Sequence, residues 1–545
     1  MFIDFADATC SIPTETDLCI VGSGVMGLAI ASHLLNHSAR QILLVEEGGL
    51  EDTNTTSAVA AELQGGDLAS AVDNSRARGF GGSSRRWGGQ ALPFSALDLA
   101  DRPFLSQRGG WPISWEELNR FYPAADQFLG LTSMPFTTDL WKRQAVTAPF
   151  AEGSDLELSI SKYSPHAYLA SVYQKPITTS KQADCLINAK VASVVLEGDG
   201  ARAQGVKVRN SHGREATISA RVVVLCSGGI ENPRILLASQ QLDRRGVGNQ
   251  ADLVGRYYQD HVGFFAAELR PLDWARFRHL FASFLPGDQK YVPKIQLAQS
   301  LQRSQGLLSV IGNIDVQEGE NSPRNCARRI YRKLRHARPI SAESGSTFHD
   351  LRRLVSSAPD ALKLLSAHLL EHRIGLPKKA RFFLMANAES EPLHASRITL
   401  SDQLDGYGLN RPKVSWLVSD LTLNALKAYG VAVKNTLESA TIAEVRLSPY
   451  LTDPKANWKE RAYSLYHHMG ATRMSSSPKE GVVDSYGRVH GIDNLYIAGT
   501  SILPSGSSSN PSYTALALAF RTAEHLLRQE PLKITTLNSP FQGPT

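Results

Sequence analysis

The 545-residue sequence predicts an α/β fold in which a doubly wound parallel sheet is combined with a second domain. Two observations carry this prediction. Residues 17–45 show a strand, a glycine turn, a helix and a second strand, and residues 494–527 return to the same style after a long stretch of different character. Because large cofactor enzymes often interleave their domains, we expect two interleaved domains rather than a simple series.

Composition narrows the class of protein. Hydrophobic residues make up 42% of the chain and charged residues 20%, so large cores can form. The net charge of +6 is small for this length and disfavours a nucleic-acid binder. The five cysteines contain no C-x-x-C pair, which indicates neither a disulfide framework nor a zinc site. With neither a signal-peptide pattern nor a long apolar run, the sequence predicts a soluble, cytoplasmic protein.

The first motif is G-S-G-V-M-G, which lies between an apolar run and a predicted helix over 25–37. A glycine at the first position permits a tight turn, one at the second lets a pyrophosphate approach the backbone, and one at the third lets helix and strand pack closely. The motif places Gly22, Ser23, Gly24 and Gly27 at a dinucleotide site. Glu46, 19 residues after Gly27, is expected to bind ribose hydroxyls. A purely structural glycine turn is the alternative.

A second glycine-rich stretch, G-F-G-G-S-S-R-R-W-G-G, spans residues 79–89. Five glycines in eleven residues predict a backbone that passes close to a flat or charged group, although a flexible surface loop is the alternative. Residues 111–130 then predict one helix, with Ser114 as its N-cap and Glu117 three residues on.

Later elements follow from the same patterns. Residues 183–226 alternate apolar and polar positions and end in a run over 222–225 that is typical of a buried parallel strand. Residues 270–450 have little glycine punctuation, several amphipathic windows, and strand-like runs near 382–385 and 397–400, and so predict a separate substrate or cap domain. The run LYIAG predicts a strand, and TALALAFRTAEHLL predicts a helix.

The third motif, H-H-M-G-A-T-R-M over 467–474, is followed by S-S-S-N-P-S with Asn510. Adjacent histidines seldom converge on one ion, so no metal site is predicted. The structural alternative for His467 is a satisfied histidine in a polar loop.

Together these stretches resemble the glucose–methanol–choline (GMC) oxidoreductase family. The resemblance rests on the fingerprint ending in E-E-G-G, the G-G-S-S…W-G-G loop, V-V-L-C-S-G-G-I-E-N-P-R-I-L-L, V-G-R-Y-Y-Q-D-H, and the His467…Asn510-Pro511 ending. It is weak between residues 270 and 450. Within the family, the ending is more similar to bacterial sugar dehydrogenases and pyranose oxidase-like members than to the aryl-alcohol branch.

The resemblance implies a Rossmann-like FAD-binding domain of the PHBH type, interleaved with a substrate domain built on an antiparallel sheet. We expect the FAD-binding domain to comprise residues 1–130, 186–268 and 463–530. The substrate domain is expected to comprise 131–185 and 269–462, with a C-terminal tail over 531–545.

The resemblance also assigns residues. His467 matches the catalytic histidine and Asn510 the second active-site position, while His468 falls on a position that varies. The expected FAD contacts are Gly22, Ser23, Gly24, Gly27, Glu46, Gly82, Ser83, Trp87, Gly88, Gly89, Val191, Gly499, Thr500, Pro511 and Ser512. Members with covalent flavin carry a histidine in the G-G-S-S…W loop, where Arg85 and Arg86 stand here. The implied FAD is therefore non-covalent.

The implied reaction is oxidation of a CH–OH group of a sugar, glycoside or polyol-like secondary metabolite, with oxygen or another electron acceptor reoxidising the flavin. His467 would take the hydroxyl proton while hydride passes to flavin N5, and Asn510 would stabilise oxyanion character. A neutral imidazole near its ordinary pKa of about 6.5 suits this base role, and the rate of flavin reduction should rise with pH through the apparent pKa of the histidine. The alternatives are a lyase or isomerase with structural FAD, and a flavin-binding scaffold.

One feature is not shared with the family pattern. Seven basic residues fall within 324–338, and apolar residues there recur with helical spacing, which predicts a basic amphipathic helix. A solvated face is the plainest interpretation. The alternatives are contact with an anionic membrane surface, an acidic electron-acceptor protein or a charged substrate carrier.

Overall fold

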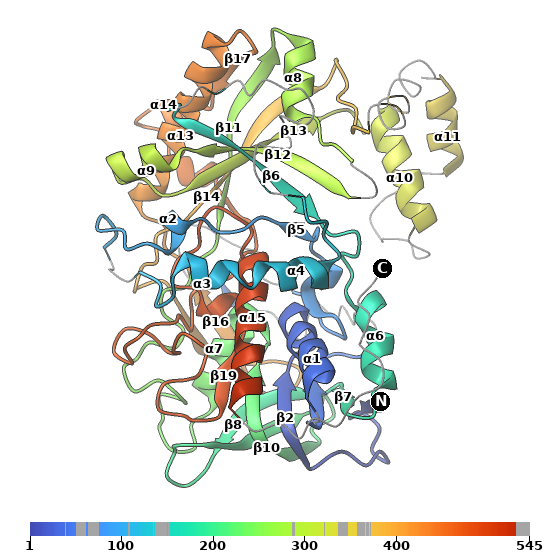
Figure 1. Cartoon of the computed structure of the whole chain (residues 1–545), viewed down its shortest axis with the longest axis vertical. Helices are drawn as coiled ribbons and strands as arrows, with labels where there is room; N and C mark the ends of the chain where they lie inside the picture. Colours follow the sequence, from blue (N-terminus) through green and yellow to red (C-terminus); the bar gives the residue numbers. More distant parts are fainter. Residues whose placement is uncertain are drawn as a thin grey trace.

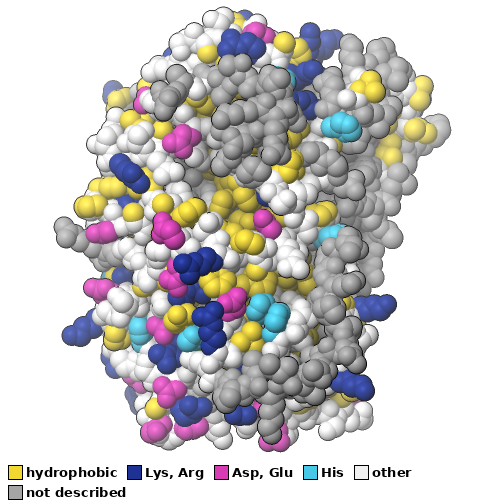
Figure 2. Space-filling model, in the orientation of Figure 1, with side chains coloured by type: hydrophobic (Ala, Val, Ile, Leu, Met, Phe, Trp, Pro, Cys, Tyr) yellow, Lys and Arg dark blue, Asp and Glu magenta, His cyan; other side chains and the backbone are white. Residues whose placement is uncertain are grey.

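The computed structural model describes residues 1–38, 40–50, 62–63, 76–106, 110–134, 136, 150, 153–285, 289–320, 322–335, 347–356, 366, 370 and 372–529. It has two lobes, each built around its own large sheet (Figure 1). On the face in Figure 2, basic and acidic side chains are interspersed over the lower half of the molecule.

The lower lobe confirms the predicted α/β unit. Its sheet has the order β1-β7-β3-β2-β10-β9-β8, and β19 also pairs with β10. The apolar runs of the sequence form its central parallel strands, which are buried because helices cover them. The strands are β1 (Phe2–Asp4), β2 (Glu15–Val21), β3 (Ile42–Val45), β7 (Ala183–Ile187), β8 (Lys190–Leu196), β9 (Ala203–Arg209), β10 (Glu215–Leu225) and β19 (Leu495–Ile497).

Helices of this lobe include the two that the sequence predicts at its ends. α1 (Val25–His37) has the predicted bounds, and the long C-terminal helix α15 (Pro511–Arg528) packs against it. Others are α2 (Ala96–Leu99), α6 (Ala170–Thr179) and α7 (Gly228–Ala238).

The single helix predicted over 111–130 is two helices, α3 (Trp115–Asn119) and α4 (Tyr122–Leu129). The Ser114 cap is confirmed, since its side chain accepts from the Glu117 backbone N–H. Pro123 favours a helix start because its ring lacks the N–H donor, and it therefore divides the stretch.

The upper lobe contains an antiparallel sheet of order β17-β11-β14-β13-β12-β6-β5, with β18 paired to β11. One face packs its apolar residues against α13 (Asp420–Ser439). The strands are β5 (Gln90–Ala91), β6 (Leu156–Tyr163), β11 (Val262–Pro271), β12 (Lys290–Leu297), β13 (Val310–Gln317), β14 (Arg381–Ala388), β17 (Ala443–Leu447) and β18 (Tyr463–Ser464). Short helices are α8 (Trp274–Phe281), α9 (Gln299–Gln305) and α14 (Pro449–Thr452).

Sheet membership differs from the expected domain boundaries at four strands. β5 (Gln90–Ala91) and β18 (Tyr463–Ser464) belong to the upper sheet, although they fall within the ranges expected for the FAD-binding domain. β7 (Ala183–Ile187) pairs with β1 and β3 in the lower sheet, although the boundary at 186 cuts through it. β11 (Val262–Pro271) belongs to the upper sheet, although residues up to 268 were expected in the FAD-binding domain. An apolar run does not reveal which sheet it joins, because the pairing partner lies far away in sequence. The division into FAD and substrate domains otherwise stays a prediction.

A third, small sheet has the order β15-β16-β4, formed by β15 (Arg397–Leu404), β16 (Asn410–Ser415) and β4 (Glu62–Leu63). The predicted basic helix is confirmed as α10 (Pro323–Arg335), which lies with α11 (Thr347–Ser356) at the side of the upper lobe in Figure 1. Arg329 forms an ion pair with the buried Asp350 of α11, so it is not part of a solvated face. Residues 336–338 and the tail 531–545 lie outside the described residues.

Candidate active site

The first glycine motif forms a tight strand-to-helix turn. Gly22 has φ +100°, and a Cβ there would lie 2.8 Å from the carbonyl oxygen of Cys226. A Cβ on Gly27 would lie 1.9 Å from the carbonyl oxygen of Gly22, so no side chain fits between helix and strand. At Gly24 the nearest atom is the Cα of Gly82, 3.9 Å away. Gly24 therefore leaves room at the N-terminus of α1.

A long cavity begins at this turn. Eleven of the sequence-predicted residues line it, from both ends of the chain: Gly22, Gly24, Glu46, Gly82, Ser83, Val191, His467, Gly499, Thr500, Pro511 and Ser512. The remaining predicted residues do not line it, namely Ser23, Gly27, Trp87, Gly88, Gly89 and Asn510. The fold thus gathers most of the predicted site into one cavity.

Glu46 ties three loops together. Its Oε2 accepts from the N–H and the hydroxyl of Ser23 at 3.0 and 2.7 Å, and its Oε1 accepts from the N–H groups of Gly48 and Gly79, both at 3.1 Å. Burial raises the pKa of this carboxyl, while the four hydrogen bonds oppose the rise. These bonds use the acceptor capacity of the carboxylate, so the predicted ribose contact requires one of them to be exchanged.

The loop over 79–89 connects the two lobes. A Cβ on Gly82 would lie 2.8 Å from the Cα of Gly24, so the backbones of the two glycine loops are in direct contact. Trp87 donates from its indole Nε1 to the carbonyl of Ala167 at 2.6 Å. Gly89 has φ +66°, and a Cβ there would lie 3.1 Å from the Cβ of Ser164. The end of this loop is therefore fixed against the segment that follows β6.

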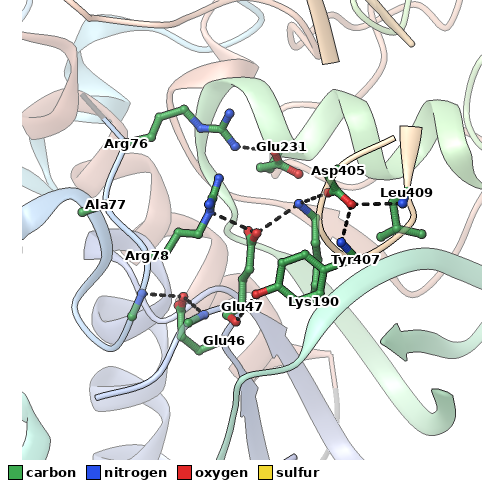
Figure 3. A network of polar contacts seen from close by, with 12 residues as sticks. Glu46, Glu47, Arg76, Ala77, Arg78, Lys190, Glu231, Asp405, Tyr407 and Leu409 are labelled. Carbon is green, nitrogen blue, oxygen red and sulfur yellow. Dashed lines mark hydrogen bonds and ion pairs between the residues drawn. The ribbon is translucent and has the colours of Figure 1, made fainter. Parts of the chain in front are cut away.

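A buried polar network contributes to the wall of the cavity (Figure 3). The Nζ of Lys190 lies 3.0 Å from Glu47 Oε1 and 2.8 Å from Asp405 Oδ2, and Arg78 Nε lies 3.0 Å from the same Glu47 oxygen. Lys190 precedes Val191, which places these charges beside the position expected to contact adenine.

Glu231 forms ion pairs with Arg76 and Arg234 in the same wall of the cavity. Arg234 also donates from Nη2 to the carbonyl of Val191 at 2.6 Å. Its buried Nη1 has no hydrogen-bond partner among the described residues, and Arg234 lines the cavity. This donor is available to an acceptor of a bound group.

His467 lines the cavity where the two lobes meet, three residues after β18 of the upper sheet. Its Nε2 is 3.1 Å from Asn510 Nδ2, and its Nδ1 is 2.8 Å from Nδ1 of the fully buried His261. The backbone N–H of His467 donates to Asp260 Oδ1 at 2.7 Å, and Ser464 donates to Asp260 Oδ2 at 2.6 Å. Asp260 thus fixes the loop after β18 to the start of β11.

These contacts assign the tautomers of the two histidines. His261 Nε2 lies 3.1 Å from the carbonyl oxygen of Gly506, which accepts only, so Nε2 carries the hydrogen. His261 Nδ1 is then the acceptor for the Nδ1 hydrogen of His467. The Nε2 of neutral His467 therefore presents a lone pair toward Asn510.

The same surroundings keep His467 neutral. Burial first, and then His261, His468 and Lys294, lower the pKa of His467 well below its ordinary value. This differs from the expectation of a value near 6.5, which ignored desolvation. A buried neutral imidazole can accept a proton without first losing one.

His468 is held differently from its neighbour. Its Nδ1 lies 2.6 Å from the hydroxyl of Tyr258, its carbonyl accepts from Thr500 Oγ1 at 2.6 Å, and burial lowers its pKa to about 3. The bond to Thr500 links the histidine loop to the Gly499-Thr500 turn. His468 is thus engaged within the protein at the cavity wall.

Asn510 stands at the N-cap of α15 but makes no side-chain cap hydrogen bond. Its amide is directed to His467 instead, which sacrifices a stabilising cap. Tyr466, directly before His467, has φ +63°, an uncommon value for a bulky residue. Both a missing helix cap and a positive φ at a residue other than glycine occur more often at functional sites than elsewhere.

The described residues fit an FAD group. Gly24 and Gly228 both line the cavity and have no heavy atom closer than 3.9 Å to an added Cβ, and the N-termini of α1 and α15 lie in its wall. These features suit a pyrophosphate and a polar ring edge. The Nη1 of Arg234 supplies a donor at the Val191 end.

Sequence reasoning missed several residues of this site. His261 and Asp260 belong to the V-G-R-Y-Y-Q-D-H stretch, which carried part of the family resemblance but received no role. Glu47 and Arg234 belong to the E-E-G-G and V-V-L-C-S-G-G-I-E-N-P-R-I-L-L stretches, which also carried the resemblance but gave these two residues no role. Lys190 lies outside the quoted motifs, and the fold brings it to Glu47. Within the described ranges, no group of His, Cys, Asp or Glu side chains is arranged to hold a metal, and no helix could cross a membrane.

Comparisons with known proteins identify the family of this chain. Two GMC oxidoreductase profiles match residues 169–263 and 392–519. The chain is 21% identical to 2-methyl-1,2-propanediol dehydrogenase of Mycolicibacterium austroafricanum, over 82% of this chain and 80% of that protein. It is 22% identical to the large subunit of fructose dehydrogenase of Gluconobacter japonicus, a match that covers 57% of this chain and only 48% of that subunit.

The fold is also that of a solved structure. Formate oxidase of Aspergillus oryzae RIB40 superposes with a TM-score of 0.56 at 15% identity, covering 95% of this chain and 99% of that one. The likeness confirms the predicted fold class. The chain belongs to the GMC oxidoreductase family and is an FAD-dependent alcohol oxidoreductase.

Proposed function

We propose that this enzyme oxidises a CH–OH group of a sugar, glycoside or polyol-like secondary metabolite to a carbonyl, with His467 as the base. The observation that carries the proposal is the pair formed by His467 Nε2 and Asn510 Nδ2, 3.1 Å apart, with His467 lining the cavity. FAD, when bound, supplies the acceptor for the hydride at its N5 atom. The remaining requirement is a base for the hydroxyl proton, and a neutral buried imidazole meets it.

The histidine pair orients the base. Because His261 accepts the Nδ1 hydrogen of His467, the Nε2 lone pair is the one that faces Asn510. The hydroxyl hydrogen of a bound alcohol points to this lone pair, and the proton is held at Nε2 after transfer. We propose His261 as a positioning residue, since its imidazole acts through His467.

Asn510 cannot exchange protons usefully, but its amide can donate to the substrate oxygen as negative charge develops there. Pro511 and Ser512 begin α15, whose N-terminus is directed into the cavity. This end of the helix carries partial positive charge, which favours electron-rich atoms of the bound cofactor. His467, Asn510 and the expected FAD contacts are therefore proposed as one site.

Three narrower points belong to the proposal. FAD is held non-covalently, because Arg85 and Arg86 stand where covalent members carry histidine, and Arg85 is engaged with the carbonyl of Phe80 at 3.0 Å. The enzyme falls in the bacterial sugar dehydrogenase and pyranose oxidase-like branch. Oxygen or another acceptor takes the electrons, and α10 is a candidate contact for a membrane or protein partner.

The test is anaerobic addition of candidate alcohols to the FAD-loaded enzyme. Oxidation of substrate requires the absorbance of the oxidised flavin near its long-wavelength maximum to bleach. A product formed without bleaching would favour the lyase or isomerase alternative. Acid precipitation of the same sample should leave a yellow supernatant, and flavin that stays with the protein would contradict non-covalent binding.

A further inference from the structure

The upper sheet has one apolar face and one polar face. Residues directly opposite one another on neighbouring antiparallel strands point to the same side. By this rule Ser159, Lys294, Asn313 and Met385 form one row across β6, β12, β13 and β14. Asn387 lies two residues further along β14 on the same face. Leu158, Ile295 and Leu384 point the other way, into the core.

The two sides of this sheet connect to residues of the proposed site. At its β6 edge, Gln90, directly after Gly88 and Gly89, donates to Ser161 at 2.8 Å. A Cβ on Gly88 would lie 3.4 Å from the ring of Tyr163. At the opposite side, β18 pairs with β11 and leads into His467 three residues later. The row with Lys294 lies between these two edges in the strand order.

Lys294 is unusual among the residues of this face. Only 3% of it is exposed, and its Nζ donates to Asn313 Oδ1 at 2.8 Å. Within the described ranges it forms no ion pair. Burial, together with nearby Lys290, lowers its pKa to about 7. Burying an ammonium group beside a single neutral partner destabilises the folded protein. Such groups are found where a bound ligand of opposite charge compensates for the lost solvation.

Two other polar atoms on this face have no hydrogen-bond partner in the part of the chain that the structure describes. They are Ser159 Oγ and Asn387 Oδ1, whose residues are 9% and 7% exposed. Lys290, four residues before Lys294 and on the same face, lies with its Nζ 4.5 Å from the centre of the Tyr163 ring. The face therefore offers positive charge and unused polar atoms side by side.

We infer that the substrate of this enzyme carries a carboxylate, which Lys294 binds while Ser159 and Asn387 contact its hydroxyl groups. The substrate class is thus a sugar acid or another hydroxylated acid rather than a neutral sugar or an amino sugar. This inference rests on the proposed function, because it assumes that the polar face and His467 serve one substrate. The charge of Lys294 also acts on His467, which is consistent with their proximity.

The experiment uses the FAD-loaded enzyme and compounds that differ in charge. D-glucuronate, D-glucose and D-glucosamine form one set, and D-gluconate and D-sorbitol form another. Rates of anaerobic flavin reduction are measured for each, and binding is measured separately from the change in the oxidised flavin spectrum. Variants are Lys294→Met, the charge-retaining Lys294→Arg, and Lys207→Met, which removes a charge exposed on β9.

For the wild type and Lys207→Met, we expect the acids to bind and react about 10- to 100-fold better than their neutral counterparts, the size expected of a charge-assisted contact. Lys294→Met should bring this ratio near one, and Lys294→Arg should retain part of it. A wild-type preference for the neutral or cationic compound, or an unchanged preference in Lys294→Met, would overturn the inference. If no compound bleaches the flavin, the oxidation proposal fails for this set, while the binding spectra still decide the role of Lys294.

Discussion

The two lobes differ in where they keep their functional residues. In the lower lobe, these residues lie in loops at the ends of parallel strands, where Gly22, Gly24 and Gly499 mark them in the sequence. In the upper lobe, the residues that we propose to bind the substrate lie along the face of an antiparallel sheet, at alternate positions of strands such as β12. A loop that cradles a phosphate needs glycine at fixed positions, whereas a sheet face accepts any polar side chain.

Because of this difference, we expect substitutions in the two lobes to affect different properties of the enzyme. The cofactor lobe is constrained by backbone geometry, so its substitutions should act through folding and FAD binding. The polar face of the upper sheet, which we propose binds the substrate, is constrained by side-chain chemistry, so substitutions there should act through specificity and pH dependence. His467 and His261 stand at the junction and connect the two.

The largest effect is expected from a pair of glycine substitutions in the cofactor lobe. Gly27→Ala places a methyl group 1.9 Å from the Gly22 carbonyl, so helix and strand must separate and folding should fail or the melting temperature fall steeply. Gly24→Ala meets nothing closer than 3.9 Å and should fold while binding FAD more weakly. Thermal melts and FAD content measure both. Equal damage from the two would contradict the assignment of Gly24 to the cofactor.

A smaller loss of activity is expected from His261→Phe, which removes the acceptor for the Nδ1 hydrogen of His467. The Nε2–H tautomer of His467 then becomes available, so flavin reduction should slow about 10- to 100-fold, as for other orienting partners of a histidine. His261→Gln retains an acceptor and should recover part of the rate. Stopped-flow reduction gives the rates, and the spectrum of bound FAD checks the fold. Equal loss in both variants would argue for a merely structural role.

The pH dependence of reduction sharpens the same point. Burial and the neighbouring charges hold the pKa of His467 well below 6.5, so the base is already neutral at neutral pH. The limiting reduction rate with a neutral alcohol should therefore be flat from about pH 6.5 to 8 and fall only in acid. A rise in the reduction rate centred near pH 6.5 would show that His467 titrates as an ordinary, solvated histidine.

The smallest effect is expected on the thermal stability of the protein, and it comes from Lys294 on the polar face of the upper sheet. The pKa of Lys294 is lowered from 10.5 to about 7 on folding, so between these values the unfolded chain binds one more proton than the native protein. Wild-type stability should therefore rise with pH over this range. Lys294→Met should melt a few degrees higher than wild type at pH 7, roughly 2–4 °C per kcal/mol, and the gap should narrow toward pH 10. A variant that melts lower at pH 7 would identify Lys294 as a structural residue.

The sequence predicted the cofactor lobe well for physical reasons. The α1 bounds, the buried strand over 222–225 and the helix after Asn510 each follow from local periodicity or from a cap. The break between α3 and α4 was missed because the weight of Pro123 as a start signal was overlooked. The expected boundary near 186 falls inside β7, because strand pairing is a long-range property that local patterns do not show.

The candidate site divides in the same way. His467 and Asn510 could be predicted because a family pattern fixes their positions, and the fold brings them to 3.1 Å. His261 and Lys294 could not, since their roles depend on burial and on partners about 206 and 19 residues away. The predicted pKa near 6.5 failed for the same reason, because desolvation is a property of the folded state.

The central claim is that His467 is the base, and anaerobic stopped-flow measurement of flavin reduction in His467→Ala and His468→Ala tests it most directly. His467→Ala should keep the FAD spectrum and reduce its flavin about 10²- to 10⁴-fold more slowly, the usual share of a positioned acid–base group. His468→Ala should cost far less, because that ring is bonded to Tyr258 within the protein. Reduction of His467→Ala at the wild-type rate would contradict the account.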